Sequence, residues 1–369
     1  MPIQITNYQC PACTGPLHFE GSSGKLECEY CGTQFFVKEI EELYKGKEAA
    51  AEAASVQAQA AAQAAKEEPK DEYAWEPEAE NLRVYTCPSC GAELFCEETT
   101  AATSCPYCGN PTVVPGQFHG QMKPDFILPF RLDKNAAVAA LKNYYKGKRL
   151  LPKTFSEQNH IEEIKGVYVP FWLFDGRVSA DLTFNATKVH SFTSGKYRIT
   201  ETDHFVLRRA GTLDFRRIPA DGSTKMPDAL MDAIEPFDYN DLKGFSTAYL
   251  PGFLADIYDV SAKEASERAV RRACNTAVSE LSATVVGYTS CAPVNQQVTM
   301  PRVKAKYALL PVWMLSTRWN GKNYLFAMNG QTGKLIGDLP VSMGRWWAWF
   351  FGIAAPLAAV MAAVLFGLM

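Results

Sequence analysis

The longest uninterrupted apolar stretch of the chain lies at its C-terminal end. Residues 346–369 form a run of 24 residues without a charge, and a helix of that length spans a hydrocarbon core of roughly 30 Å. Arg345 precedes the run and three tryptophans crowd its beginning, which is typical of a membrane interface. The pattern therefore predicts a transmembrane helix over 345–369 in preference to a buried core helix. Because the run continues to Met369, a second span beyond it stays open.

Two related apolar runs dominate the middle of the chain, at 167–174 and 308–315, and each contains Pro-x-Trp. A short strand pattern and then an amphipathic helix pattern precede each run, and the second helix begins with a capping box of Ser261 and Glu264. The sequence thus predicts an α+β domain over 117–342. It is internally duplicated, with copies at about 125–190 and 252–340 and antiparallel sheets.

Residues 191–217, between the two copies, alternate apolar and polar positions and predict a long exposed hairpin. Several arginines gather in its second half. They are either solvated surface charges or a docking surface for an acidic partner or lipid headgroups. The candidate docking residues are Arg208, Arg209, Arg216 and Arg217.

Near the N-terminus, periodic patterns give way to alanine. Between Ala49 and Ala65, 11 of 17 residues are alanine, the best helix former. Large apolar residues do not form a stripe here, so tight packing is not expected. The segment 39–80 is therefore predicted to be a spacer, either a helical rod or a flexible linker.

Cysteine spacing carries the clearest chemistry, because eight of the 11 cysteines lie in C-x-x-C pairs. Each set has two pairs with 14 residues between them, and the second set repeats the first at an offset of 77 residues. Two such turns place four thiolates on one tetrahedron, which predicts zinc ribbons at 1–38 and 81–116, with iron as the alternative. The predicted ligands of these two structural Zn²⁺ ions are Cys10, Cys13, Cys28 and Cys31, then Cys87, Cys90, Cys105 and Cys108.

Charge and compartment narrow the range of partners. The net charge is −3, and the N-terminus lacks the basic and apolar segments of a secretory signal. Cysteines in metal-binding spacing fit a reducing compartment, so the part before the span is expected to face the cytoplasm at the cell membrane. Residues 86–118 contain no Lys or Arg. Nucleic acid, which is bound mainly through cationic contacts, is therefore not the favoured partner.

Catalytic motifs are missing from the sequence. It has no phosphate-binding G-x-x-x-x-G-K-[ST], no H-E-x-x-H and no G-x-S-x-G, and the five histidines show no ligand spacing. A ribbon with four protein ligands is closed, so its metal is structural. The chain is accordingly not expected to be an enzyme or to bind a small-molecule substrate. A site in a cleft between the two copies is the remaining enzymatic possibility.

Taken together, the two ribbons, the Pro-x-Trp strands, the Asn329-Gly-Gln-Thr-Gly-Lys turn and the terminal apolar run resemble a known family. It consists of bacterial membrane-anchored double zinc-ribbon proteins, often described as TFIIB-type zinc ribbon-containing. The resemblance implies association with flotillin-like and phage-shock-type proteins in membrane stress. It supplies no catalytic residues.

The expected function is therefore that of a membrane-tethered zinc-ribbon adaptor that binds other proteins. The alternative is a nucleic-acid-associated zinc-ribbon factor of transcription or replication, held at the membrane. The sequence leaves the identity of the partner and the oligomeric state open.

Overall fold

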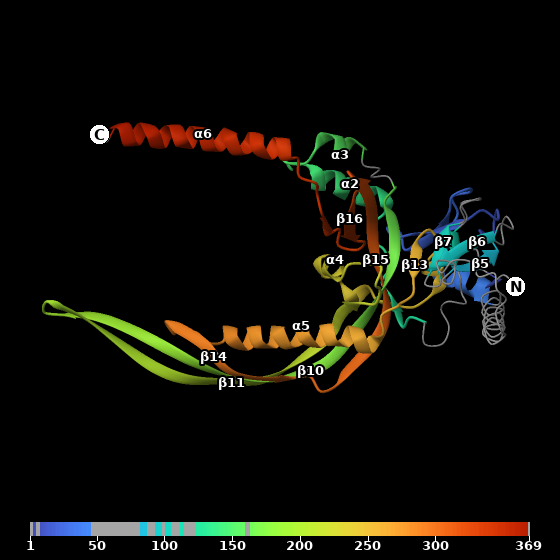
Figure 1. Cartoon of the computed structure of the whole chain (residues 1–369). Helices are drawn as coiled ribbons and strands as arrows, with labels where there is room; N and C mark the ends of the chain where they lie inside the picture. The colour runs from blue at the N-terminus through green and yellow to red at the C-terminus, as the bar shows by residue number, and fades with distance from the viewer. Residues whose placement is uncertain are drawn as a thin grey trace, which may run out of the picture.

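The computed structural model describes residues 3–4, 8–45, 82–86, 93–97, 100–104, 111–113, 123–158 and 163–367 (Figure 1). Most of the predicted spacer and the second cysteine set lie outside these residues. The strands near the N-terminus are β1 (Ile3–Gln4), β2 (Leu17–Glu20), β3 (Lys25–Cys28), β4 (Gln34–Phe36), β5 (Leu82–Thr86), β6 (Glu93–Glu97), β7 (Thr100–Ser104) and β8 (Pro111–Val113). A helix occupies residues 37–45.

The body consists of long strands with a few helices. Its strands are β9 (Phe126–Ile127), β10 (Lys165–Ser194), β11 (Tyr197–Asp221), β12 (Lys243–Gly244), β13 (Leu254–Asp256), β14 (Ser290–Thr299), β15 (Val303–Trp319), β16 (Lys322–Asn329) and β17 (Leu335–Gly337). The α-helices are α2 (Lys134–Tyr145), α3 (Lys153–Gln158), α4 (Asp228–Ala233), α5 (Ala262–Ala283) and α6 (Met343–Gly367).

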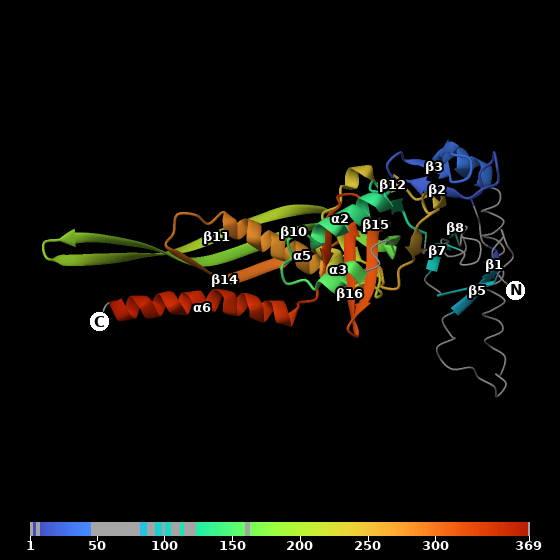
Figure 2. The same cartoon turned by 90° about the horizontal axis from the view of Figure 1, so that it is seen from above.

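The described chain is mainly β-sheet, so the expected α+β class is wrong. One sheet of 11 strands connects β7 and β8 with the body strands β9 to β17. Strands β10 and β15 are far longer than the sequence pattern suggested, because their apolar Pro-x-Trp cores continue into polar, alternating segments of the same strands. Helices cover parts of this sheet without forming a layer of equal weight (Figures 1 and 2).

A pseudo-two-fold axis relates the two Pro-x-Trp segments. Strands β10 and β15 pair antiparallel with Val169 opposite Leu310, and these two residues hold equivalent places in the repeated pattern. Around this pair, the short strand of each copy joins the long strand of the other. β9 runs parallel to β15, and β13 runs parallel to β10. Each half of the body is therefore completed by a strand from the other half.

A tryptophan in each copy forms a hydrogen bond to the backbone that follows the short strand of the other copy. The Trp172 indole Nε1 donates a hydrogen bond to the Val260 carbonyl at 2.9 Å, and the Trp313 Nε1 donates to the Leu132 carbonyl at 3.1 Å. Val260 and Leu132 each follow the short strand of the opposite copy. Both indoles are almost fully buried, so satisfying the N–H group at each site avoids the cost of burying an unpaired donor.

The predicted extended structure over 191–217 is confirmed, but this segment is not a hairpin by itself: almost all of it belongs to one strand, β11, which pairs with β10 to form a long arm. Strands β10 and β11 pair antiparallel from Phe171–Asp221 out to Ser194–Tyr197, and β14 adds a third strand along part of β10. Helix α5 lies along the arm (Figure 1). A buried alanine stripe, which lets the helix approach the sheet closely, faces it: Ala265, Ala269, Ala273 and Ala277.

The start of α5 offers a test of the capping interpretation. The amide of Glu264 donates to Ser261 Oγ at 3.3 Å, and the Ser261 amide donates to Glu264 Oε2 at 2.9 Å. We expect Ser261→Ala to lower the free energy of unfolding by about 1 kcal/mol, measured by urea denaturation. Ser266→Ala is the matched control, because its hydroxyl donates only to the Lys263 carbonyl of the same helix. Equal losses in the two variants would contradict the capping role.

The C-terminal apolar run is helical as α6, but the predicted transmembrane helix is wrong. Within the described residues, no helix is both long enough and apolar enough to cross a membrane. The predicted location at the cell membrane rested on that span and is overturned with it. Helix α6 begins against the body, where the Ser342 amide donates to the Leu150 carbonyl at 2.9 Å, and then projects away from it (Figure 1).

Candidate metal centre

The first cysteine set forms two knuckles with matching backbone geometry. In the first, the Thr14 amide donates to the Cys10 carbonyl at 2.8 Å; in the second, the Gly32 amide donates to the Cys28 carbonyl at the same distance. The residue after each second cysteine has a positive φ, 61° at Thr14 and 68° at Gly32. Glycine suits that conformation, whereas Thr14 adopts it against the steric preference of a β-branched residue.

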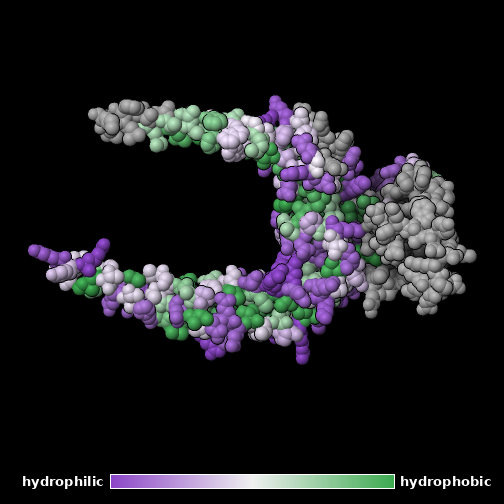
Figure 3. All heavy atoms as spheres, viewed as in Figure 1, coloured by the Kyte–Doolittle hydropathy of each residue, from purple (hydrophilic) through white to green (hydrophobic). Residues whose placement is uncertain are grey.

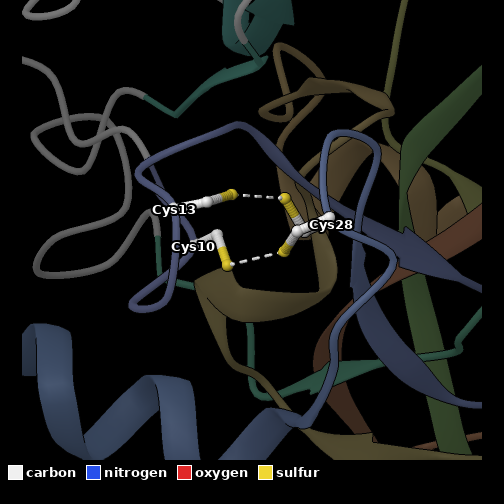
Figure 4. A group of neighbouring side chains, drawn as sticks. Cys10, Cys13 and Cys28 are labelled. Carbon is white, nitrogen blue, oxygen red and sulfur yellow. Dashed lines mark hydrogen bonds between the residues drawn. The ribbon is translucent and has the colours of Figure 1, made fainter.

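The two knuckles bring four thiols together (Figure 4). Cys10 Sγ lies 3.6 Å from Cys31 Sγ, and Cys13 Sγ lies 3.4 Å from Cys28 Sγ. All four sulfur atoms fall within 4.8 Å of one another. A tetrahedral zinc with Zn–S bonds of about 2.3 Å requires sulfurs about 3.8 Å apart, so the donor set fits Zn²⁺. This confirms a metal-binding arrangement at one of the two predicted sites.

Local hydrogen bonds favour the thiolate form of Cys31 at the rim of the site. The Thr33 hydroxyl lies 3.2 Å from Cys31 Sγ, and this hydroxyl together with the Thr33 backbone lowers the pKa of Cys31 to about 6. Metal binding requires deprotonated sulfur. Cys31 is thus prepared to act as a ligand at neutral pH, while Cys10 and Cys28 are buried beneath it.

The zinc ribbon packs directly on the body. The Phe19 amide donates to the Pro251 carbonyl at 2.9 Å, and its ring meets the Tyr249 ring edge-on at 5.2 Å. Tyr8 Oη lies 2.6 Å from Thr247 Oγ1. Phe19, Leu17 and Cys28 belong to the same hydrophobic core as body residues. The ribbon that contains the metal site therefore shares a packed interface with the body.

His18 lies at this junction and is not a ligand. Its Nε2 is 3.3 Å from Glu29 Oε1, and a Cβ added at Gly252 would lie 2.9 Å from its Nδ1. Burial lowers the pKa of His18, and Glu29 opposes this effect. The imidazole packs between ribbon and body, as a structural residue does.

The second cysteine set, Cys87, Cys90, Cys105 and Cys108, lies outside the described residues. The neighbouring strands are described: β5 pairs with β6, and β7 pairs with β8 and also with β13 of the body, with Ala102 opposite Ala255. One metal site is therefore evident in the described chain. The second zinc ion stays a prediction.

The four candidate docking arginines are divided over the arm. Because side chains alternate along a strand, Arg208 and Arg209 point to opposite faces of β11. Arg208 forms an ion pair with Asp181, and Arg209 Nε donates to Thr284 Oγ1 at 3.2 Å. Arg217 Nη1 donates to the Tyr239 carbonyl at 2.9 Å. Arg216 also lies on β11, directly before Arg217. Docking by these four residues stays a prediction.

A cavity of about 470 Å³ lies between the ribbon and both copies of the body. Phe253 and Trp313 contribute aromatic surface to it, and charged side chains line its rim. Two of the rim residues already have partners: His18 pairs with Glu29, and Asp133 accepts the Ala136 amide at 2.7 Å. The sequence did not predict this junction, because it depends on contacts between distant segments. An enzymatic site in this cleft stays a prediction.

Comparison with known proteins supports the metal site. Residues 9–39 match the Trm112p-like protein family, which covers the four cysteines and the ribbon strands. No solved structure matches the chain. Over its whole length the chain is similar to the Bacillus subtilis (strain 168) protein called "Uncharacterized protein YdjG", with 36% identity over 350 residues, 95% of this chain and 94% of the relative.

The chain belongs to the YdjG family. The match covers 95% of this chain. The N-terminal zinc-binding domain is Trm112p-like, which suggests a role in protein interaction. For the YdjG family, neither match shows membrane tethering or association with flotillin-like proteins.

Proposed function

We propose that this chain is a non-enzymatic adaptor that binds a protein partner through its N-terminal zinc ribbon. The observation that carries the proposal is Tyr30, which stands between the ligands Cys28 and Cys31 and is 75% exposed. Its ring packs over Gly15, where an added Cβ would lie 2.8 Å from the ring. An exposed tyrosine is the kind of residue that dominates protein interfaces.

Further apolar surface lies on the same domain. Phe36 is 58% exposed with the Lys25 ammonium 4.8 Å from its ring centroid, and Leu43 is exposed on the following helix. The Trm112p-like match supports a protein-binding role for this domain. In the full proposal the second cysteine set holds a second zinc ion, and the partners are flotillin-like or phage-shock-type proteins, as the family resemblance suggests.

Nucleic acid is the less favoured partner. Glu20, Glu27 and Glu29 lie on the described ribbon with Lys25 and Lys38, and a zinc ion held by four thiolates adds a formal charge of about −2. Such a surface repels phosphate groups, which supply most of the affinity in nucleic-acid binding.

Affinity purification of the tagged full chain tests the proposal. We expect Tyr30→Ala to reduce the recovered partner, identified by mass spectrometry, at least about tenfold, as for an interface hot spot. Tyr197→Ala is the matched control, because Tyr197 is 77% exposed at the far end of the arm. Unchanged recovery with Tyr30→Ala, or recovery of nucleic acid in place of protein, would overturn the proposal.

A further inference from the structure

Helix α6 carries a dense group of exposed large apolar side chains. Figure 3 shows it projecting from the body with apolar residues toward solvent. Nine of its large side chains are between 39% and 64% exposed: Trp346, Trp347, Trp349, Phe350, Phe351, Ile353, Leu357, Val360 and Met361. Contiguous apolar surface on this scale marks an interaction site.

The exposed side chains contain a regular seam. Trp346, Phe350, Ile353, Leu357 and Val360 follow one another at spacings of four, three, four and three residues. This alternation is the heptad spacing by which two helices pack side by side. The seam therefore fits another helix better than it fits a strand or a loop.

The base of the seam is already shaped as a groove. A cavity of about 490 Å³ lies between α6 and the turn after α2, lined by Arg149, Leu150 and seam residues. The Arg149 guanidinium stacks on the Trp349 ring at 4.8 Å, and the Ser342 amide is bonded to Leu150. These contacts fix the direction of α6 from the body, so the seam is presented in one orientation.

We propose that α6 pairs along this seam with α6 of a second copy of the chain, forming a homodimer. The seam carries no charge between Trp346 and Gly367 that could select a foreign partner, and an identical heptad seam is complementary to itself. Trp347 and Phe351 face away from the seam, so seven side chains of about 200 Å² each, roughly half exposed, offer about 700 Å² per chain. A stable interface buries about 800 Å² per partner.

This inference goes beyond the adaptor role, because it concerns a surface remote from the zinc ribbon. A dimer would present two ribbons and two arms from one assembly. Binding by two linked modules strengthens attachment without any new contact. The proposed dimer and the proposed partner binding at Tyr30 are tested by different experiments, and either proposal can be wrong while the other holds.

Cysteine cross-linking of the full chain tests the proposal. In a Cys291→Ser background, Leu357→Cys places a thiol on the seam, and Ala355→Cys places one on the opposite side of the same helix. We expect oxidation to give a covalent dimer with Leu357→Cys and little with Ala355→Cys. Equal cross-linking at both positions would overturn the proposal.

Light scattering in solution provides the second measurement. We expect the native chain to have twice its mass of 40.8 kDa. Leu357→Glu should lower the ratio of dimer to monomer at least about tenfold, since a buried unpaired charge is costly, whereas Ala355→Glu should leave it unchanged. A native monomer, whether bare or carrying bound detergent or lipid, would show that a second copy does not cover α6.

Discussion

Cys28→Ser is expected to abolish metal binding at the first ribbon and to destabilise the body as well. The four thiolates supply most of the folding free energy of so small a domain, on the order of 10 kcal/mol. Cys28 is also buried in the core that the ribbon shares with the body. We therefore expect the variant to lose one equivalent of zinc by elemental analysis and to lower the unfolding temperature of the whole chain.

Cysteines outside the site give the control. Cys291→Ser changes an exposed cysteine on the arm, and Cys274→Ser changes a partly buried one on α5; neither belongs to the four-sulfur cluster. Both should keep the zinc content of the native chain. If Cys28→Ser lost its zinc while the body melted at the native temperature, the ribbon would be an independent module.

The second large effect concerns Asp221, a buried carboxyl at the end of β11. Only 3% of the residue is exposed; its Oδ1 accepts the Ser223 amide at 3.1 Å, and its Oδ2 has no hydrogen-bond partner among the described residues. Burial raises the pKa of Asp221 to about 7. Asp228 and Asp259 reinforce this shift, while the Ser223 amide and Arg268 oppose it.

The sign of the pH effect follows from this raised pKa. The unfolded carboxyl ionises near pH 3.8, whereas the folded one holds its proton until about pH 7. The protonated Asp221 carboxyl therefore makes its full contribution to the free energy of unfolding below pH 3.8, and this contribution is lost as the pH rises through about 7. We expect Asp221→Asn, which cannot ionise, to stabilise the chain at pH 8 by on the order of 2 kcal/mol and to have a smaller effect at pH 5.

The pseudo-symmetry supplies the matched variant. Asn329 holds the place equivalent to Asp221, and its Nδ2 donates to the Ile234 and Pro236 carbonyls, each at 3.1 Å. Asn329→Asp would remove both donors and place a buried carboxylate beside those carbonyls. We expect it to destabilise the chain by about 3 kcal/mol at pH 8. Urea denaturation at both pH values measures each variant, and a pH-independent effect of Asp221→Asn would contradict the assignment.

Local chemistry explains what the sequence could predict. Cys10 and Cys13 lie within one turn of chain, so their spacing determines how their thiols can meet. The extended structure of residues 191–217 was likewise visible, because alternation is a property of neighbouring residues, whereas the pairing of β11 with β10 was not. The Ser261 capping box needed only residues three apart.

The features that the sequence did not predict depend on contacts between distant residues, or on properties other than hydrophobicity. The long continuation of β10 beyond Phe174 changes the fold class, and it is stabilised by β11 and β14 from elsewhere in the chain. Apolar composition correctly indicated a helix for α6 but wrongly predicted that it crosses a membrane. The packing of Phe19 on Tyr249 joins residues that no spacing rule connects.

The exchange of short strands between the two copies also determines how the chain can be divided. Because β9 completes the half that contains β15, and β13 completes the half that contains β10, neither half is a whole sheet on its own. In its connectivity the body resembles a domain-swapped dimer whose two subunits have been fused into one chain. A covalent break between the copies would consequently leave two entangled fragments and no separable half.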